Sequence, residues 1–344
     1  MTIIKLLGGL GLFIYGMKLM GDGLENAAGE GLKNILEKVT KNPVIAVIVG
    51  AVVTMVIQSS SATTVMVVGF VNAGLMNLAQ AAGIIMGANI GTTITAQLVA
   101  FKLDEIAPVF VFVGAMMVMF VKGKKRREIG NIILGFGILF VGMGTMSAAM
   151  KPLTTLPMFQ DILTTVGQHW YLGVIAGTLI TALLQSSSAT TGILVALATA
   201  GALNIDQALP IIMGCNIGTC ITAMLATVGT NKTAHRAAML HLIFNVVGTL
   251  IFLPIIIPGF LGDFVSYFTG DVKRQIANAH TIFNVVNTLI MVPLIPVLCK
   301  VVEKIIPGED DEKVGPKYID DRLLETPVIA AGQVVKEGWL IKLS

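Results

Sequence analysis

A duplication constrains this chain more than any other feature. Shifting the sequence by 127 positions places residues 50–98 on residues 177–225 without a gap, and 27 of the 49 aligned residues are identical. One polar string, QSSSATT, recurs unchanged at Gln58–Thr64 and Gln185–Thr191. Self-similarity at a fixed offset indicates that one structural unit has been repeated. We therefore expect two copies of one unit, covering residues 1–125 and residues 126–306.

Both copies are too apolar for a soluble domain. The chain has 344 residues, of which 55% are hydrophobic and only 12% are charged, with a mean hydropathy of +0.84. Soluble domains carry about a quarter charged residues. The composition predicts an all-α polytopic membrane protein in the inner or plasma membrane of a bacterium, with the lipid bilayer as its surroundings. Basic patches with interleaved aromatic residues are missing from the sequence, so nucleic acid is not an expected partner.

The charges around the two copies predict opposite orientations in the membrane. Basic residues near the ends of spans stay in the cytoplasm, which places the string KGKKRR at Lys122–Arg127 inside. Residues 22–42 hold three lysines where their counterpart in the second copy holds one. Such a reversal is typical of inverted-topology repeats. Lys273 and Arg274, which this scheme places outside, count against it.

Each copy is expected to contain a re-entrant helical hairpin. Pro43 opens an apolar stretch of about 15 residues, which is shorter than the roughly 20 that cross a bilayer. We predict hairpins over residues 43–76 and 170–203, with the two QSSS strings as tips near the bilayer midplane. An amphipathic surface helix is expected before the first hairpin, over residues 24–40.

A broken transmembrane helix is expected after each hairpin, over residues 79–100 and 207–228. These segments contain GANIGTT and GCNIGTC, whose glycines predict an interruption of the helix. Two further spans complete the second copy. The charged residues 307–344 are predicted to form a cytoplasmic tail.

The polar tips predict an internal site for an anion. Irregular backbone at membrane depth is tolerated only where protein buries it or where it lines a cavity. A half-helix that begins at each tip would direct its positive dipole end and free N–H groups toward that cavity, and serine hydroxyls would add donors. The alternative is that these small polar residues only join neighbouring helices. The unchanged recurrence of the whole string favours the binding site.

The same groups suit Na⁺, because hydroxyl and amide oxygens are hard ligands. The predicted hairpins contain no Asp, Glu, Lys or Arg, which disfavours a proton relay. The sequence also lacks the Gly-x-Ser-x-Gly motif that a serine hydrolase would place at Ser59 or Ser186. The chain is therefore not expected to be an enzyme, to have a catalytic residue or to need a cofactor; Na⁺ would be its coupling ion.

Two histidine–asparagine pairs lie on the last two predicted spans. His241 precedes Asn245 by four residues, and His280 precedes Asn284 by the same spacing, so each pair lies on one helical face. We expect interhelical hydrogen bonds from these pairs; a cavity wall or a proton-sensitive gate is the alternative.

These motifs resemble the Na⁺/phosphate cotransporter family, the bacterial relatives of type II sodium-dependent phosphate cotransporters. The resemblance rests on the paired QSSSATT and GxNIGT strings and on the strings GLFIYGMKLMGDGL and HLIFNVVGTL, and it covers about residues 1–300. It implies secondary active transport in which Na⁺ entry drives uptake of inorganic phosphate by alternating access. The implied phosphate-binding residues are Gln58, Ser59, Ser60, Ser61, Gln185, Ser186, Ser187 and Ser188. The candidate Na⁺-binding residues are Thr63, Thr64, Asn89, Thr92, Thr190, Thr191, Asn216 and Thr219.

Two other functions stay open. A Na⁺-coupled carrier of another oxyanion would use the same hydroxyl-rich tips, and a membrane sensor or scaffold would bind phosphate without transporting it. Residues 307–344 resemble the start of the PhoU-like domain that many bacterial members carry. The resemblance also allows a homodimer, although no stretch of the sequence identifies an interface.

Overall fold

The computed structural model describes residues 2–28, 42–101, 103 and 105–308. All regular elements of that part of the chain are helices, and they belong to one compact unit, residues 1–307. Most of the expected surface helix (residues 24–40) and almost all of the expected tail lie outside the described residues. The helices are α1 (Thr2–Ala28), α3 (Pro43–Ile57), α4 (Ser60–Asn72), α5 (Leu78–Val99), α6 (Ala107–Phe120), α7 (Lys124–Met150), η1 (Leu153–Thr155), α8 (Pro157–Gln168), α9 (Trp170–Leu184), α10 (Ser187–Thr199), α11 (Ile205–Ala226), α12 (Lys232–Ile256), α13 (Phe260–Phe268), α14 (Val272–Met291), η2 (Val292–Leu294) and α15 (Ile295–Ile305).

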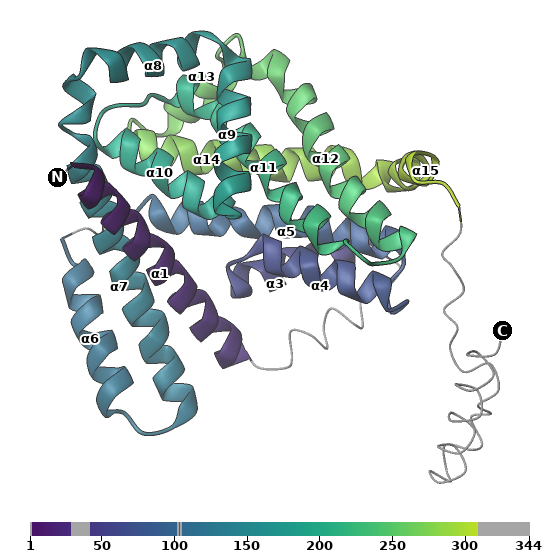
Figure 1. The fold of residues 1–344 in the computed structure, drawn as a ribbon, viewed down its shortest axis with the longest axis horizontal. Coiled ribbons are helices and arrows are strands. Elements are labelled where there is room, and N and C mark those ends of the chain that lie inside the picture. The colour runs from purple at the N-terminus through teal and green to yellow at the C-terminus, as the bar shows by residue number, and fades with distance from the viewer. Residues whose placement is uncertain (1, 29–41, 102, 104, 309–344) are drawn as a thin grey trace. The chain divides into compact units, whose positions relative to one another are not determined.

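The two copies contain matching helices, with α3, α4 and α5 corresponding to α9, α10 and α11 (Figure 1). The match extends to the residues that start the helices. Ser59 Oγ accepts a hydrogen bond from the Ala62 N–H at 3.1 Å, and Ser186 Oγ accepts one from the Ala189 N–H at 3.1 Å. These N-caps satisfy donors that lack an intrahelical partner. α5 and α11 each begin with a capping box.

A two-residue link joins the two helices within each pair of short helices. Gln58 joins α3 to Ser59 with a φ of 58°, and Gln185 joins α9 to Ser186 with a φ of 52°. Non-glycine residues seldom adopt this left-handed conformation. The two glutamines are the only non-glycine residues with positive φ in the described part of the chain. The polar tips are thus sharp turns between two helices.

The expected interruption of the spans at GANIGTT and GCNIGTC is wrong. α5 and α11 are each continuous over 22 residues. The glycines let a neighbouring helix approach closely instead: a Cβ on Gly91 would lie 2.5 Å from the Ala51 carbonyl oxygen, and one on Gly218 would lie 2.5 Å from the Thr178 carbonyl oxygen. Small residues commonly serve this packing role in membrane helices.

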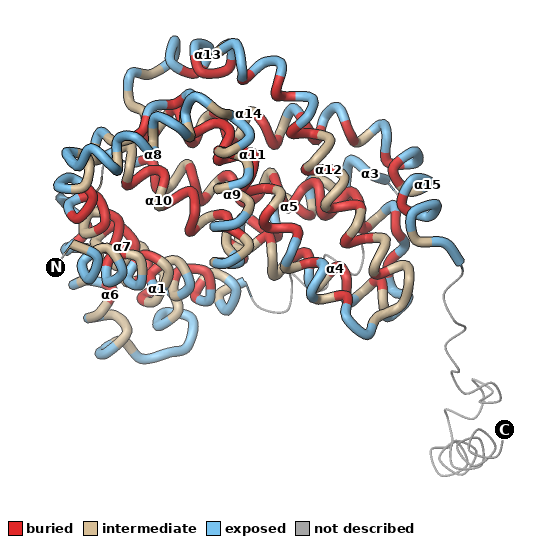
Figure 2. The backbone as a smooth tube through the Cα atoms, turned by 45° about the horizontal axis from the view of Figure 1, so that its top comes forward, coloured by how far each residue is buried: buried red, intermediate tan, exposed pale blue. Residues whose placement is uncertain are grey.

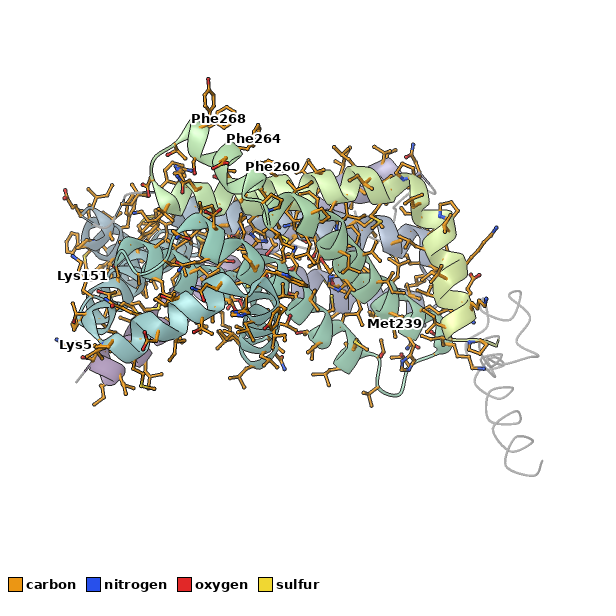
Figure 3. The ribbon with its side chains drawn as sticks, turned by 90° about the horizontal axis from the view of Figure 1, so that it is seen from above. Lys5, Lys151, Met239, Phe260, Phe264 and Phe268 are labelled. Carbon is orange, nitrogen blue, oxygen red and sulfur yellow. The ribbon has the colours of Figure 1, made fainter. Side chains whose placement is uncertain are left out.

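Six helices of the described residues are long and apolar enough to cross a membrane. Of these, α5 and α11 are the most buried, and they lie in the middle of the bundle (Figure 2). The outer helices expose apolar side chains, as lipid contact requires. On α13, the exposed rings of Phe260, Phe264 and Phe268 point away from the bundle (Figure 3).

α1 and α7 pack together as an antiparallel pair through glycines. Gly9 lies against Met146 near one end, and Gly23 lies against Ile132 and the Glu128 carbonyl oxygen near the other. The C-terminal part of α1 therefore lies beside the basic string that precedes Glu128. This arrangement places one end of α1 at the site described next.

Candidate functional site

The two polar tips, which are far apart in the sequence, meet in the fold. Ser61 Oγ donates a hydrogen bond to the Gln185 carbonyl oxygen at 3.5 Å. A cavity of about 260 Å³ lies at this meeting point. All eight residues expected on the phosphate side line the cavity: Gln58, Ser59, Ser60, Ser61, Gln185, Ser186, Ser187 and Ser188.

The N-termini of α4 and α10 begin at this cavity. The first N–H groups of a helix have no intrahelical acceptor, and the helix dipole makes this end positive. Ser60 and Ser187, the first residues of the two helices, are each only 4% exposed and still line the cavity. Two helix ends and a group of hydroxyls thus line one side of a small cavity, which suits an oxyanion.

Charged residues from α1 also line the cavity, and our sequence analysis missed them. Lys18, Asp22 and Glu25 are exposed and face the cavity together with Met17. Their spacing of four and three residues places them on one helical face. That spacing was the signal that sequence reasoning could have used. The exposed charges indicate that the cavity is open at the C-terminal part of α1.

The expected Na⁺-binding threonines fall into three groups. Thr92 lines the cavity, whereas its counterpart Thr219 donates to a carbonyl oxygen of its own helix. Thr63 and Thr190 each connect the two short helices of their pair, because each accepts a hydrogen bond at 2.9 Å from a threonine of the preceding helix. Thr64 and Thr191 form the third group.

The hydroxyl oxygens of Thr64 and Thr191 are buried and lack a hydrogen-bond partner among the described residues. The two residues occupy equivalent positions and are 1% and 2% exposed. An unpartnered buried hydroxyl costs about 1–3 kcal/mol. A ligand that the hydroxyl oxygen coordinates would offset that cost, and Na⁺ fits the oxygen chemistry.

Asn89 and Asn216 take part in hydrogen bonds between helices. Asn89 Nδ2 donates to Asn245 Oδ1 at 3.0 Å, and Asn89 Oδ1 lies 3.4 Å from His241 Nε2. The second copy repeats this pattern: Asn216 Nδ2 donates to the Asn284 side chain at 2.8 Å. His280 Nε2 lies 3.1 Å from Asn216 Oδ1, so the expected interhelical hydrogen bonds are confirmed.

A cluster of three or more His, Cys, Asp and Glu side chains that could hold a metal ion is not found in the part of the chain that the structure describes. The polar lining of the cavity comprises hydroxyls, amides, helix ends and three charged groups on α1, and it lies beside apolar side chains such as Ile14 and Ile57.

Comparison with known proteins connects this site to a family. The sequence profile of the Na⁺/Pi-cotransporter family matches the chain twice, at residues 12–148 and 148–286. The double match supports the internal repeat.

Several curated proteins are similar to the chain. YqeW of Bacillus subtilis, a protein without an assigned function, is 33% identical over 77% of this chain and 86% of its own length. The proposed inorganic phosphate export protein YjbB of Salmonella typhimurium is 27% identical over 98% of this chain. Sodium-dependent phosphate transport protein 2A of Rattus norvegicus is 37% identical over 28% of this chain and 15% of its own length.

The chain spans 62% of the length of the YjbB relatives. No solved structure matches it significantly. The family profile covers both repeats, and the similarity to YqeW extends over most of both proteins. The chain belongs to the Na⁺/Pi-cotransporter family.

Proposed function

We propose that the protein is a secondary active transporter that couples Na⁺ entry to uptake of inorganic phosphate. The observation that carries the proposal is the meeting of two identical QSSS tips at one cavity. A phosphate ion held there would accept hydrogen bonds from serine hydroxyls and from the N-termini of α4 and α10. No fixed positive charge lies on the tips themselves, so the tips would hold the anion by hydrogen bonds and helix dipoles alone.

Na⁺ would enter beside the phosphate. The unpartnered hydroxyls of Thr64 and Thr191 and the cavity-lining hydroxyl of Thr92 support this assignment. Asp22 and Glu25 would attract the cation to the cavity. Each Na⁺ that enters down a potential of 100 mV contributes about 2.3 kcal/mol, so one or two ions are enough to drive concentrative uptake.

For the fold in the membrane, we propose two inverted repeats, residues 1–125 and 126–306, each with a re-entrant hairpin. The reversed charge bias of their loops supports the inversion. In this orientation Lys122–Arg127 and the tail at residues 307–344 are cytoplasmic. Asn26 near the end of α1 donates to Glu128 at 3.5 Å, so the charged mouth of the cavity would face the cytoplasm. A homodimer stays a prediction.

Phosphate export is a second candidate, and the YjbB relatives favour it by name. The direction depends on which gradient drives the cycle. Uptake of radiolabelled phosphate into proteoliposomes, with Na⁺ inside, outside or absent, separates the two. Uptake that requires an inward Na⁺ gradient supports the first candidate. Phosphate efflux that proceeds although the Na⁺ gradient is directed inward supports export.

Competing anions in the same assay test the substrate. Inhibition by arsenate, a close phosphate analogue, with none by sulfate or succinate would identify a phosphate carrier. Sulfate or succinate flux would identify a carrier of another oxyanion. Phosphate binding without any flux would favour a sensor or scaffold.

A further inference from the structure

The tip glutamine of the first hairpin is held by hydrogen bonds at both ends of its amide. Thr95 Oγ1 of α5 donates to Gln58 Oε1 at 2.9 Å, and Gln58 Nε2 donates to the Met55 carbonyl oxygen at 2.5 Å. The Gln58 N–H also donates to the Thr54 carbonyl oxygen at 2.7 Å. Gln58 is 6% exposed. The Gln58 side chain is therefore fixed to α5 by the hydrogen bond from Thr95.

The equivalent residues of the second hairpin do not make this contact. Gln185 is exposed, and its side chain makes no hydrogen bond among the residues that the structure describes. Thr222 is the counterpart of Thr95, at the same offset of 127. Its hydroxyl oxygen is buried and has no partner in the described part of the chain. The second copy thus contains the same glutamine and threonine, but the structure shows no hydrogen bond between their side chains.

The difference does not come from the turns themselves. Both glutamines have the same left-handed backbone, with φ values of 58° and 52°. Both also line the cavity. The second pair can therefore close by moving its side chain and hairpin relative to α11, without a new backbone conformation. An open pair leaves a buried threonine hydroxyl unsatisfied, which favours closing it.

We infer that Thr95 and Thr222 are positioning residues that hold the two tip glutamines in alternation. This inference rests on the proposed transport function. In the state described here, Thr95 holds Gln58 and Gln185 is free at the cavity. In the opposite state, Thr222 holds Gln185 and Gln58 is released. The two threonines act on the substrate site through the glutamines, and each one stabilises a different state of the cavity.

Two matched positions report these states. Met17 on α1 lines the cavity and is partly exposed. The string GLFIYGMKLM of α1 resembles GILFVGMGTM of α7 at an offset of 126, so Met143 is the counterpart of Met17, and it is 1% exposed. In a Cys299→Ala background, which leaves only the buried Cys215 and Cys220, Met17→Cys or Met143→Cys provides one accessible thiol. The rate of labelling by a membrane-impermeant thiol reagent, without phosphate or Na⁺, then measures how accessible each position is. A high rate at position 17 reports the state described here, and a high rate at position 143 reports the opposite state.

Opposite effects are expected from the two threonine variants. Thr95→Val removes a bond of this state, so labelling at position 17 falls and labelling at position 143 rises. Thr222→Val has the reverse effect. A net hydrogen bond of ordinary strength predicts changes of about 2- to 10-fold. The double variant returns both rates toward the parent, and Thr95→Ser, which keeps the hydroxyl, leaves them unchanged.

Thr93→Val is the matched control, since the Thr93 hydroxyl donates only to the Ile90 carbonyl oxygen of its own helix. If Thr95→Val and Thr222→Val shift the reporters in the same direction, or no more than this control does, the inference is overturned. The readout needs no substrate. If the parent protein shows no phosphate flux, the proposed function is wrong. The labelling rates still test the alternation of the two glutamines, because they are measured without substrate.

Discussion

Ser61 of α4 and Gln185 at the end of α9 are joined by a hydrogen bond of 3.5 Å, although 124 positions separate them in the chain. This contact brings two copies of one polar string to a single cavity. Because the strings are identical, the two halves offer an anion the same donors from two directions.

Removing a tip hydroxyl should weaken phosphate binding and leave the fold intact. Ser60→Ala and Ser187→Ala each remove a donor at the start of α4 or α10. A lost hydrogen bond to a charged or buried group costs about 0.5–3 kcal/mol, so the Kd for phosphate should rise by about 2- to 150-fold. Ser147→Ala on α7 is the control, because Ser147 is buried outside this cavity. Normal transport by both tip variants would contradict the assignment.

Lys18 should increase the affinity for phosphate at the cavity mouth. Its side chain is exposed, so the ammonium is screened by solvent and Lys18→Gln should raise the KM for phosphate by only about 2- to 5-fold. The effect should shrink at high ionic strength, and Lys18→Arg should retain the parent value. Lys5→Gln, at the other end of α1 near Lys151 (Figure 3), is the control. If Lys18→Gln and Lys5→Gln change the KM for phosphate equally, Lys18 does not belong to the phosphate site.

Substitution of Thr64 or Thr191 should lower the affinity for Na⁺ more than it lowers the stability of the fold. Their hydroxyls have no hydrogen-bond partner among the described residues, so Thr64→Val or Thr191→Val should not lower the Tm in detergent. The Na⁺ concentration that gives half-maximal phosphate transport should rise. Thr63→Val is the contrast, since it breaks the hydrogen bond with Thr54 and should lower the Tm. A lower Tm with unchanged Na⁺ dependence at Thr64 and Thr191 would mark them as packing residues.

The asparagine network should act mainly on stability. Asn245→Ala leaves Asn89 Nδ2 buried without its acceptor, which should cost about 1–3 kcal/mol and lower the Tm. Asn284→Ala should do the same for Asn216. An unchanged Tm together with a lost Na⁺ dependence would instead favour Asn89 and Asn216 as ligands of the ion.

The glycines of α5 should tolerate no side chain. A methyl group at Gly87 would overlap the Val47 carbonyl oxygen of α3. Gly87→Ala should therefore destabilise the protein by about 1–3 kcal/mol, although alanine has the higher helix propensity by about 1 kcal/mol. Gly69→Ala on α4 is the control, because no described atom outside the nearby backbone of α4 lies within 4 Å of the added Cβ, and it should be neutral or stabilising. Equal Tm values for the two variants would contradict close packing of α3 on α5.

The repeat made much of this fold predictable. Identical strings at a fixed offset predicted both pairs of short helices, because Pro43 and the polar tips limit the apolar stretches to about 15 residues. The continuity of α5 and α11 was not predictable from GANIGTT alone. A glycine can either break a helix or let a neighbouring helix approach, and only the position of α3 or α9 decides between these outcomes.

The site was predictable only in part, for a related reason. The tips were identified because their polarity stands out in an apolar sequence. Lys18, Asp22 and Glu25 were missed, since their position at the cavity depends on how α1 packs against the first hairpin: Gly21 lies against the Ile57 carbonyl oxygen. The difference between Gln58 and Gln185 is not encoded locally at all, because both lie in the same string.

The central claim is that the two tips form one phosphate site. Calorimetric titration of the purified protein with phosphate in the presence of Na⁺ tests this claim most directly, with the parent, Ser60→Ala and Ser187→Ala compared. We predict one phosphate per chain, with the same single site weakened by either substitution. Two phosphates per chain, with each substitution removing one and sparing the other, would contradict a shared site.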